Sequence, residues 1–109
     1  MYLMSDFSRV SDDATRNEVI ELVQSLGEGT NSIAILGHRP QVYIQNAYLA
    51  DRDEFALDFR DGEPRRHYTV NVQSKDTVLS AFLSYYSGDN RWRTMVEWQR
   101  DAHYERLQG

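Results

Sequence analysis

The sequence predicts a single α+β domain over residues 1–109, with two amphipathic helices packed on one face of a mostly antiparallel five-stranded sheet. Three observations predict this fold class. Apolar residues recur at helical spacing in two segments, they alternate with polar residues in the other segments, and the connections between those segments are short. The predicted order is helix, four strands, helix and strand, with residues 100–109 as a frayed or helical tail.

The first predicted helix covers residues 11–26, where four apolar residues recur at three- and four-residue spacing: Val19, Ile20, Val23 and Leu26. Asp12 and Asp13 suit the positive N-terminal end of a helix, and Gly27 suits a left-handed stop. Before this helix, the segment Met1–Met4 is apolar but has no basic leader, so we expect no signal peptide.

The second predicted helix covers residues 75–87, and its apolar stripe is cleaner: Val78, Leu79, Phe82, Leu83 and Tyr86. Ser74 is a suitable N-cap, Asp76 lies in the first turn, and Gly88 is placed to end the helix. Both helices are amphipathic, and each therefore needs an apolar surface to cover.

Five segments have the composition or the alternation of strands, and they cover residues 32–36, 41–49, 54–60, 67–73 and 92–99. Turn residues separate some of them, at 37–40 and at 61–64. In the third segment every second residue is apolar, namely Phe55, Leu57 and Phe59. One sheet face is therefore predicted to be apolar and covered by the helices, and the other to be polar and open.

The last predicted strand places Trp92 and Trp98 on one face, six residues apart. We expect both to pack against the helices rather than to bind a ligand, and Trp98 to be buried between the sheet and the helices. Among the seven tyrosines, Tyr43 falls on the opposite phase from Val42 and Ile44 and is predicted to be exposed beside Gln45.

Composition excludes several classes of function. The formal net charge is −5, which disfavours binding to free nucleic acid or to an anionic membrane. There is no cysteine, so disulfides, thiolate catalysis and cysteine-based zinc sites are excluded. The longest aliphatic run, residues 33–36, is far shorter than the roughly 20 residues of a membrane helix. These features favour a cytoplasmic protein.

Catalytic chemistry finds little support in the sequence. The histidines are His38, His67 and His103; no two have the spacing of metal ligands, so no metal or cofactor is expected. His67 is predicted on the open face beside Thr69 and Asp58, where it is either a weak acid–base group or an ordinary solvated histidine. Gly27 and Gly29 form no phosphate loop, because no Lys-Ser/Thr pair follows. No catalytic residue is assigned.

The acidic residues of the middle of the chain are more informative. Six carboxylates gather between residues 51 and 63, and they are predicted on the open face or at its two ends: Asp51, Asp53, Glu54, Asp58, Asp61 and Glu63. Such a surface steers a basic protein partner onto itself. It is equally typical of a solvated strand that avoids pairing with other chains. With Tyr43, these residues are the candidate partner-binding residues.

The residues 78–83 and 88–98 resemble the end of the first-numbered ("Imm-one") immunity family of bacterial polymorphic toxin systems. That family ends with an amphipathic helix, a glycine-containing turn and a short strand closing on a tryptophan, which Trp98 matches. The preceding aspartate–glycine turn, Asp61-Gly62, is also similar, and the resemblance covers about residues 32–98. Where many members have a proline before the last strand, this chain has Arg91-Trp92. The resemblance implies an α+β fold and neutralisation of a cognate toxin, often a nucleic-acid deaminase.

Three function classes follow from the sequence. The first is an immunity protein that occludes the basic active-site cleft of a toxin domain with its open, acidic sheet face. The second is a small structural or assembly module that forms homodimers through the same face. The third is an enzyme that uses His67 with Asp58.

Overall fold

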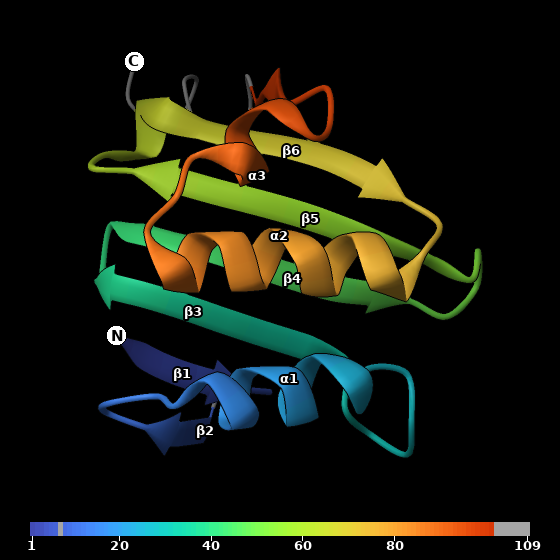
Figure 1. Ribbon diagram of the computed structural model, residues 1–109. Coiled ribbons are helices and arrows are strands. Elements are labelled where there is room, and N and C mark those ends of the chain that lie inside the picture. The colour runs from blue at the N-terminus through green and yellow to red at the C-terminus, as the bar shows by residue number, and fades with distance from the viewer. Residues whose placement is uncertain (7, 102–109) are drawn as a thin grey trace.

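The computed structural model describes residues 1–6 and 8–101, and it is an α+β fold with one antiparallel sheet (Figure 1). Its strands, in spatial order β2-β1-β3-β4-β5-β6-β7, are β1 (Tyr2–Ser5), β2 (Ser8–Ser11), β3 (Ile33–Arg39), β4 (Val42–Leu49), β5 (Glu54–Asp61), β6 (His67–Val72) and β7 (Gln99–Arg100). Its helices are α1 (Arg16–Gln24), α2 (Lys75–Ser87), α3 (Arg91–Thr94) and a 3-10 turn, η1 (Pro64–Arg66). The described part therefore has seven strands, whereas the sequence predicted five.

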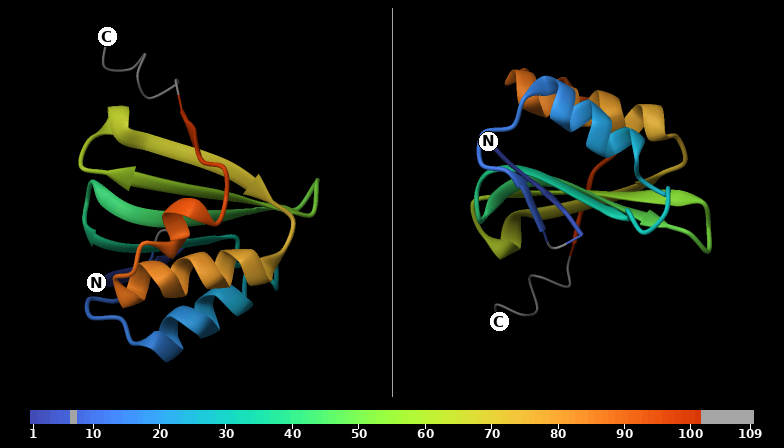
Figure 2. Two further views of the ribbon diagram at one scale, coloured as in Figure 1. Left: turned by 45° about the horizontal axis from the view of Figure 1, so that its top comes forward. Right: turned by 90° about the horizontal axis from the view of Figure 1, so that it is seen from below.

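The two longer helices lie side by side over one face of the sheet and leave the other face without a helix (Figure 2). The core between the layers combines the stripes of both helices with every second residue of the central strands. Its fully buried members include Val19, Val23, Leu36, Ile44, Leu57, Val78 and Phe82. No helix of the described residues is long and apolar enough to cross a membrane.

Helix α2 has the limits and caps that the sequence predicts. The Ser74 hydroxyl accepts a hydrogen bond from the Asp76 amide at 3.1 Å, and Gly88 ends the helix in the left-handed conformation, at φ 80°. The apolar alternation of β5 is confirmed as well, because Phe55, Leu57 and Phe59 are all buried. Those two segments combine strong local preferences with strong periodicity, and the two signals agree.

Helix α1 is shorter than predicted and begins at Arg16 rather than at Ser11. Its N-cap is Thr15, whose hydroxyl accepts from the Glu18 amide while the Glu18 carboxylate accepts from the Thr15 amide. This reciprocal capping box fixes the first turn more firmly than Asp12 and Asp13, which precede the helix. The helix ends at Gln24, before Gly27.

The N-terminal hairpin of β1 and β2 was not predicted. Each strand has only four residues, too few to show a period of two. The hairpin is anchored to β3 by Asp6, whose carboxylate accepts hydrogen bonds from the Ser32 and Ile33 amides at 3.0–3.2 Å. Leu3 on β1 is fully buried and extends the core beyond β3.

The predicted turn at residues 37–40 is also corrected, because Gly37, His38 and Arg39 belong to β3. Gly37 lies beneath the Tyr2 ring, and a Cβ there would come within 2.7 Å of that ring and within 2.8 Å of the Val42 carbonyl oxygen. The glycine therefore permits close packing inside a sheet rather than a turn.

The predicted strand 92–99 is wrong. Residues 91–94 form α3, a loop follows, and β7 contains only Gln99 and Arg100. Trp92 is buried, at 5% exposed, whereas Trp98 is half-buried at the margin of the core, so the expected full burial of Trp98 is also wrong. Arg100 belongs to β7; the rest of the predicted tail beyond Asp101, with His103, lies outside the described residues.

Candidate partner-binding surface

Three of the predicted acids lie together at the β4–β5 connection: Asp51, Asp53 and Glu54, here called the acidic turn. The Arg52 amide donates to the Leu49 carbonyl at 3.1 Å and closes the connection. Asp53 adopts the left-handed conformation, with φ 50°. Asp51 and Asp53 are exposed, and Glu54 is half-buried at the start of β5.

The acidic turn is held by Tyr48 on β4. The Tyr48 hydroxyl donates to Asp53 Oδ1 at 2.9 Å, and its ring packs against Phe55 with 5.2 Å between ring centroids. The same hydrogen bond raises the pKa of Tyr48, because it favours the protonated phenol. The ring also lies close to Gly27, where a Cβ would approach it to 3.2 Å. The carboxylates are therefore presented on a fixed backbone.

The ends of the sheet differ in charge. Among the described residues, Arg52 is the one arginine at the acidic-turn end, and it contacts Asp51 loosely at 4.0 Å. Four other arginines belong to the opposite end, where β3 and β5 finish: Arg39, Arg60, Arg65 and Arg66. Helix α2 also ends at this arginine-rich end of the sheet (Figure 1). The next helix, α3, carries Arg91 and Arg93. The two ends therefore differ in their number of arginines, although Asp61 and Glu63 lie at the arginine-rich end. Lys75, at the start of α2, adds a positive charge near the acidic turn, because β6 ends beside Phe55.

The six predicted acids lie at the two ends and the middle of β5, as the sequence predicted, and they do not form one continuous patch. Asp61 and Glu63 lie at the opposite end of β5 from the acidic turn, and eight residues of strand span roughly 20–25 Å. Asp61 accepts from Arg66 at 2.7 Å, and Glu63 is exposed beside that pair. These two carboxylates sit among arginines and form no continuous surface with the acidic turn.

Asp58 lies between the acidic turn and the Asp61–Glu63 end of β5, in the middle of the helix-free face. Its carboxylate is hydrogen-bonded to neighbours within the sheet. Its carboxylate accepts from the Thr69 hydroxyl at 2.7 Å and lies 3.1 Å from Nε2 of His67. The Asp58 side chain is 18% exposed, so part of it still faces solvent.

His67 lies beside Asp58 and Thr69 as predicted, but it is buried, with 1% exposure, rather than solvated. The Nε–H of Arg60 donates to its Nδ1 at 3.1 Å. The ring proton is therefore on Nε2, which donates to Asp58. Both ring nitrogens are occupied within the sheet, and neither is placed to take a proton from a substrate.

Tyr43 lies on the helix-free face, as predicted from its phase, and it is half-buried. The Arg60 guanidinium lies over its ring, 5.6 Å from the centroid. Beside it runs a groove of about 550 Å³ between β1 and β4, whose apolar members also include Tyr2, Met4 and Ile35. Tyr2 and Met4 were not predicted to belong to this surface, because nothing in four N-terminal residues indicated that they join the sheet.

The described residues contain no group of three histidine, aspartate or glutamate side chains that could hold a metal ion.

Comparisons of the chain with protein-family models, with curated proteins and with solved structures found no match. The resemblance to the immunity family therefore rests on the quoted residues alone, and the strand that should close on Trp98 is not formed, because residues 91–94 are helical and β7 begins at Gln99.

Proposed function

We propose that this protein is an immunity protein that binds and neutralises a toxin domain, and that the acidic turn enters the basic cleft of that toxin. The observation that carries the proposal is the presentation of Asp51 and Asp53 on a backbone fixed by Tyr48, at an end with one neighbouring arginine. Enzymes that act on nucleic acid present basic clefts, and a nucleic-acid deaminase is a toxin of this kind.

The fixed turn suits inhibition for a physical reason. A partner that binds a flexible acidic loop must order it, whereas the acidic turn is ordered before binding, so less conformational entropy is lost. The uneven distribution of arginines adds orientation, because a basic cleft attracts the acidic turn more strongly than it attracts the end where arginines and carboxylates are mixed.

The proposal predicts that a neighbouring gene encodes a toxin domain, and it is tested by co-expression with that domain. The triple variant Asp51→Asn, Asp53→Asn, Glu54→Gln should lose protection of the host cell and bind the purified toxin domain at least tenfold more weakly. Asparagine is chosen because it tolerates the left-handed conformation at Asp53 and still accepts from Tyr48.

A matched control removes the same charge elsewhere, in the variant Asp12→Asn, Asp13→Asn, Glu63→Gln, whose three positions are exposed and lie away from the acidic turn. It should keep protection and binding. Equal loss in both variants would reduce the effect to net charge, and full protection by the first variant would refute a role for the acidic turn.

A second candidate function is a homodimeric assembly module, and the groove beside Tyr43 favours it. Tyr2, Met4 and Ile35 offer apolar contact area on a face that carries no helix. This alternative predicts a dimer whose mass, measured by light scattering at several concentrations, falls to that of the monomer in the variant Ile35→Lys. The immunity proposal predicts that the same substitution leaves toxin binding unchanged.

A further inference from the structure

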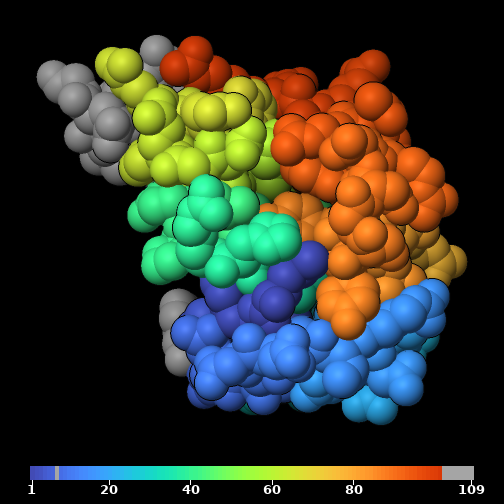
Figure 3. Space-filling view, turned by 60° about the vertical axis from the view of Figure 1, so that its left-hand side comes forward, coloured from blue at the N-terminus to red at the C-terminus, as the bar shows by residue number. Residues whose placement is uncertain are grey.

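A second feature of the molecule lies at the arginine-rich end, away from the acidic turn. A cavity of about 170 Å³ lies between the end of β3, the end of β5 and the turn that joins α2 to α3. Figure 3 shows this end, where the green and yellow connections of the sheet lie beside the orange helices. A space of roughly 150 Å³ is enough for one benzene ring.

Aromatic rings form the floor of the cavity. Phe59 meets Trp92 edge to face, with centroids 4.7 Å apart, and Tyr85 lies 5.3 Å from Trp92. The Trp92 amide donates to the Ser84 hydroxyl at 3.0 Å, and that hydroxyl donates to the carboxylate of Asp89. These contacts fix Trp92 and with it the shape of the floor. An apolar, planar ligand finds complementary surfaces here.

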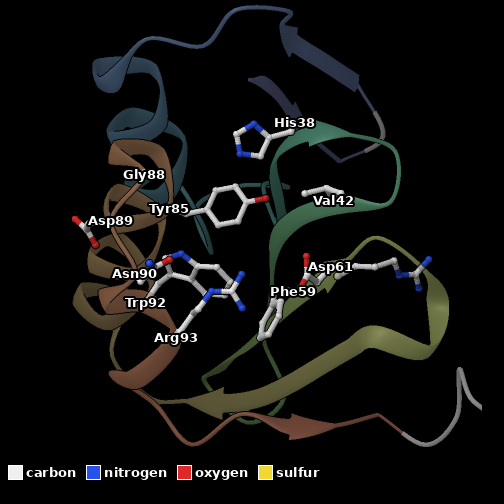
Figure 4. A pocket seen from close by; sticks show the side chains of 11 residues that line it. His38, Val42, Phe59, Asp61, Tyr85, Gly88, Asp89, Asn90, Trp92 and Arg93 are labelled. Atoms are coloured by element: carbon white, nitrogen blue, oxygen red, sulfur yellow. The ribbon is translucent and has the colours of Figure 1, made fainter.

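Tyr85 brings an unpartnered hydroxyl to this cavity. The residue is 7% exposed, and its oxygen has no hydrogen-bond partner. In Figure 4 its side chain reaches from α2 across the cavity toward Val42. A phenol keeps its proton at neutral pH and is a donor, and burial raises the pKa of Tyr85 further, to about 12. A buried donor without a partner costs stability unless a ligand accepts from it.

Arg93 supplies positive charge at the same place. Its guanidinium lies over the Trp92 ring at 4.4 Å and 5.7 Å from the Phe59 centroid. In the described part of the chain it has no carboxylate within salt-bridge distance. Stacking occupies the flat face of a guanidinium and leaves the N–H edge for a planar acceptor.

Other charged side chains that line the cavity have partners within the protein, and Arg60 donates to His67 and to Gln41. Asp61 pairs with Arg66 at 2.7 Å, and Asp89 accepts from Ser84 and from the Arg91 amide. His38 lies on the opposite side of Tyr85 from Trp92, with its ring centroid 5.6 Å from that of Tyr85 (Figure 4). Two hydrogen-bond donors at the cavity, the Tyr85 hydroxyl and the Arg93 guanidinium, suit an anionic ligand.

We propose that this cavity is a binding site for a small aromatic carboxylate, whose ring contacts Phe59 and Trp92 while its carboxylate accepts from Tyr85 and Arg93. The aromatic floor selects the ring and the two donors select the anion. The site is separate from the acidic turn and does not depend on the function proposed for it.

Benzoate is the probe, and titration calorimetry of the full chain is the measurement. We expect saturable binding with a Kd of about 1 mM or tighter, and at least tenfold weaker binding of benzamide, which keeps the ring and loses the charge. Inorganic phosphate, which has charge but no ring, should also bind at least tenfold more weakly. The indole N–H resonance of Trp92 should shift on addition of benzoate.

Two variants locate the site. Tyr85→Phe, which deletes only the unpartnered hydroxyl, should weaken benzoate binding about tenfold. Arg93→Gln should weaken it by at least as much. The matched controls Tyr86→Phe, next along α2, and Arg65→Gln, exposed on η1, should bind benzoate as the parent does. Thermal melts of all four establish that they fold.

Three results would overturn the proposal. They are the absence of saturable benzoate binding, equal affinity for benzamide, and unchanged affinity in a folded Tyr85→Phe variant. The last of these would place any benzoate binding elsewhere on the protein.

Discussion

The indole N–H of Trp98 donates to the main-chain carbonyl of Trp92 at 3.0 Å, and the two rings meet edge to face. This contact folds the chain after α3 back toward β6, where β7 begins. Phe59 is the shared neighbour, since both tryptophans pack against its ring at 4.7–4.8 Å. The two residues nevertheless contribute differently to the stability of the fold, because Trp92 is buried and Trp98 is half-buried.

The substitution Trp92→Ala should therefore lower the free energy of unfolding by about 3–5 kcal/mol, as large-to-small changes in a core do. Trp98→Ala should cost less, below about 3 kcal/mol, because part of its ring already faces solvent. Urea unfolding of the two variants measures both values. A larger loss for Trp98→Ala would contradict the difference in burial between the two residues.

The two tryptophans also show why the segment from Trp92 to Trp98 was predicted as a strand although it begins with helix α3. Trp92 and Trp98 are six residues apart, so they share a face in a strand, and periodicity alone predicts one. The actual geometry depends on Ser84, which accepts from the Trp92 amide and fixes the start of α3. That contact joins residues eight positions apart, and no local pattern reveals it.

Other parts of the fold were predictable because local and tertiary preferences agree. Ser74 and Gly88 delimit α2 by their own chemistry, and the apolar residues of β5 all face the core. Gly37 was misread because a glycine that allows close packing in a sheet has the same composition signal as a glycine in a turn.

The sequence predicted which residues form the candidate site, but it did not predict all of their hydrogen-bond partners. The alternation predicted Glu54 and Asp58 on the open face and the other four acids at its two ends, and β5 does separate Asp51 from Glu63 by its own length. The partners of Asp58 come from β6, so its hydrogen bonds with His67 and Thr69 depend on strand register. The orphaned Tyr85 hydroxyl has no signature in sequence at all.

Asn46 provides a test of the core. It lies on β4, is fully buried, and neither its side-chain nitrogen nor its oxygen has a hydrogen-bond partner. Leu57 is its neighbour on β5. Because a buried polar group without a partner costs about 1–3 kcal/mol, Asn46→Val should raise the free energy of unfolding by roughly 1 kcal/mol or more. Thermal and urea unfolding measure the change; a clear loss of stability would mean that the amide is satisfied in solution.

Tyr85 makes a prediction about alkaline pH. Its pKa is raised from 10.0 to about 12 in the folded protein, mainly by burial. Between those two values the unfolded chain loses the proton while the folded chain keeps it, so stability falls as the pH rises from 10 to 12. A difference of this size corresponds to roughly 2–3 kcal/mol.

The comparison of the parent protein with Tyr85→Phe isolates this contribution, because the other tyrosines titrate in both. The free energy of unfolding should fall more steeply with pH in the parent above pH 10, by roughly 2–3 kcal/mol at the end of the window. Parallel curves for the two proteins would show that the Tyr85 phenol titrates as it does in the unfolded chain.

Association kinetics with the toxin domain test the proposed surface most directly. Asp51 is exposed at the tip of the acidic turn, where its charge acts at long range on an approaching basic partner. Asp51→Asn should therefore lower the association rate constant, by about twofold to fivefold at low salt, and change the dissociation rate little.

Raising the salt concentration should slow association of the parent protein and reduce the difference in association rate between the parent and Asp51→Asn, because screening weakens exposed charges. Glu63→Gln serves as the control, since Glu63 is also exposed but lies among arginines at the other end of β5. If Glu63→Gln slowed association as much as Asp51→Asn, or if salt left the parent's rate unchanged, the acidic turn would not be the surface that attracts the toxin.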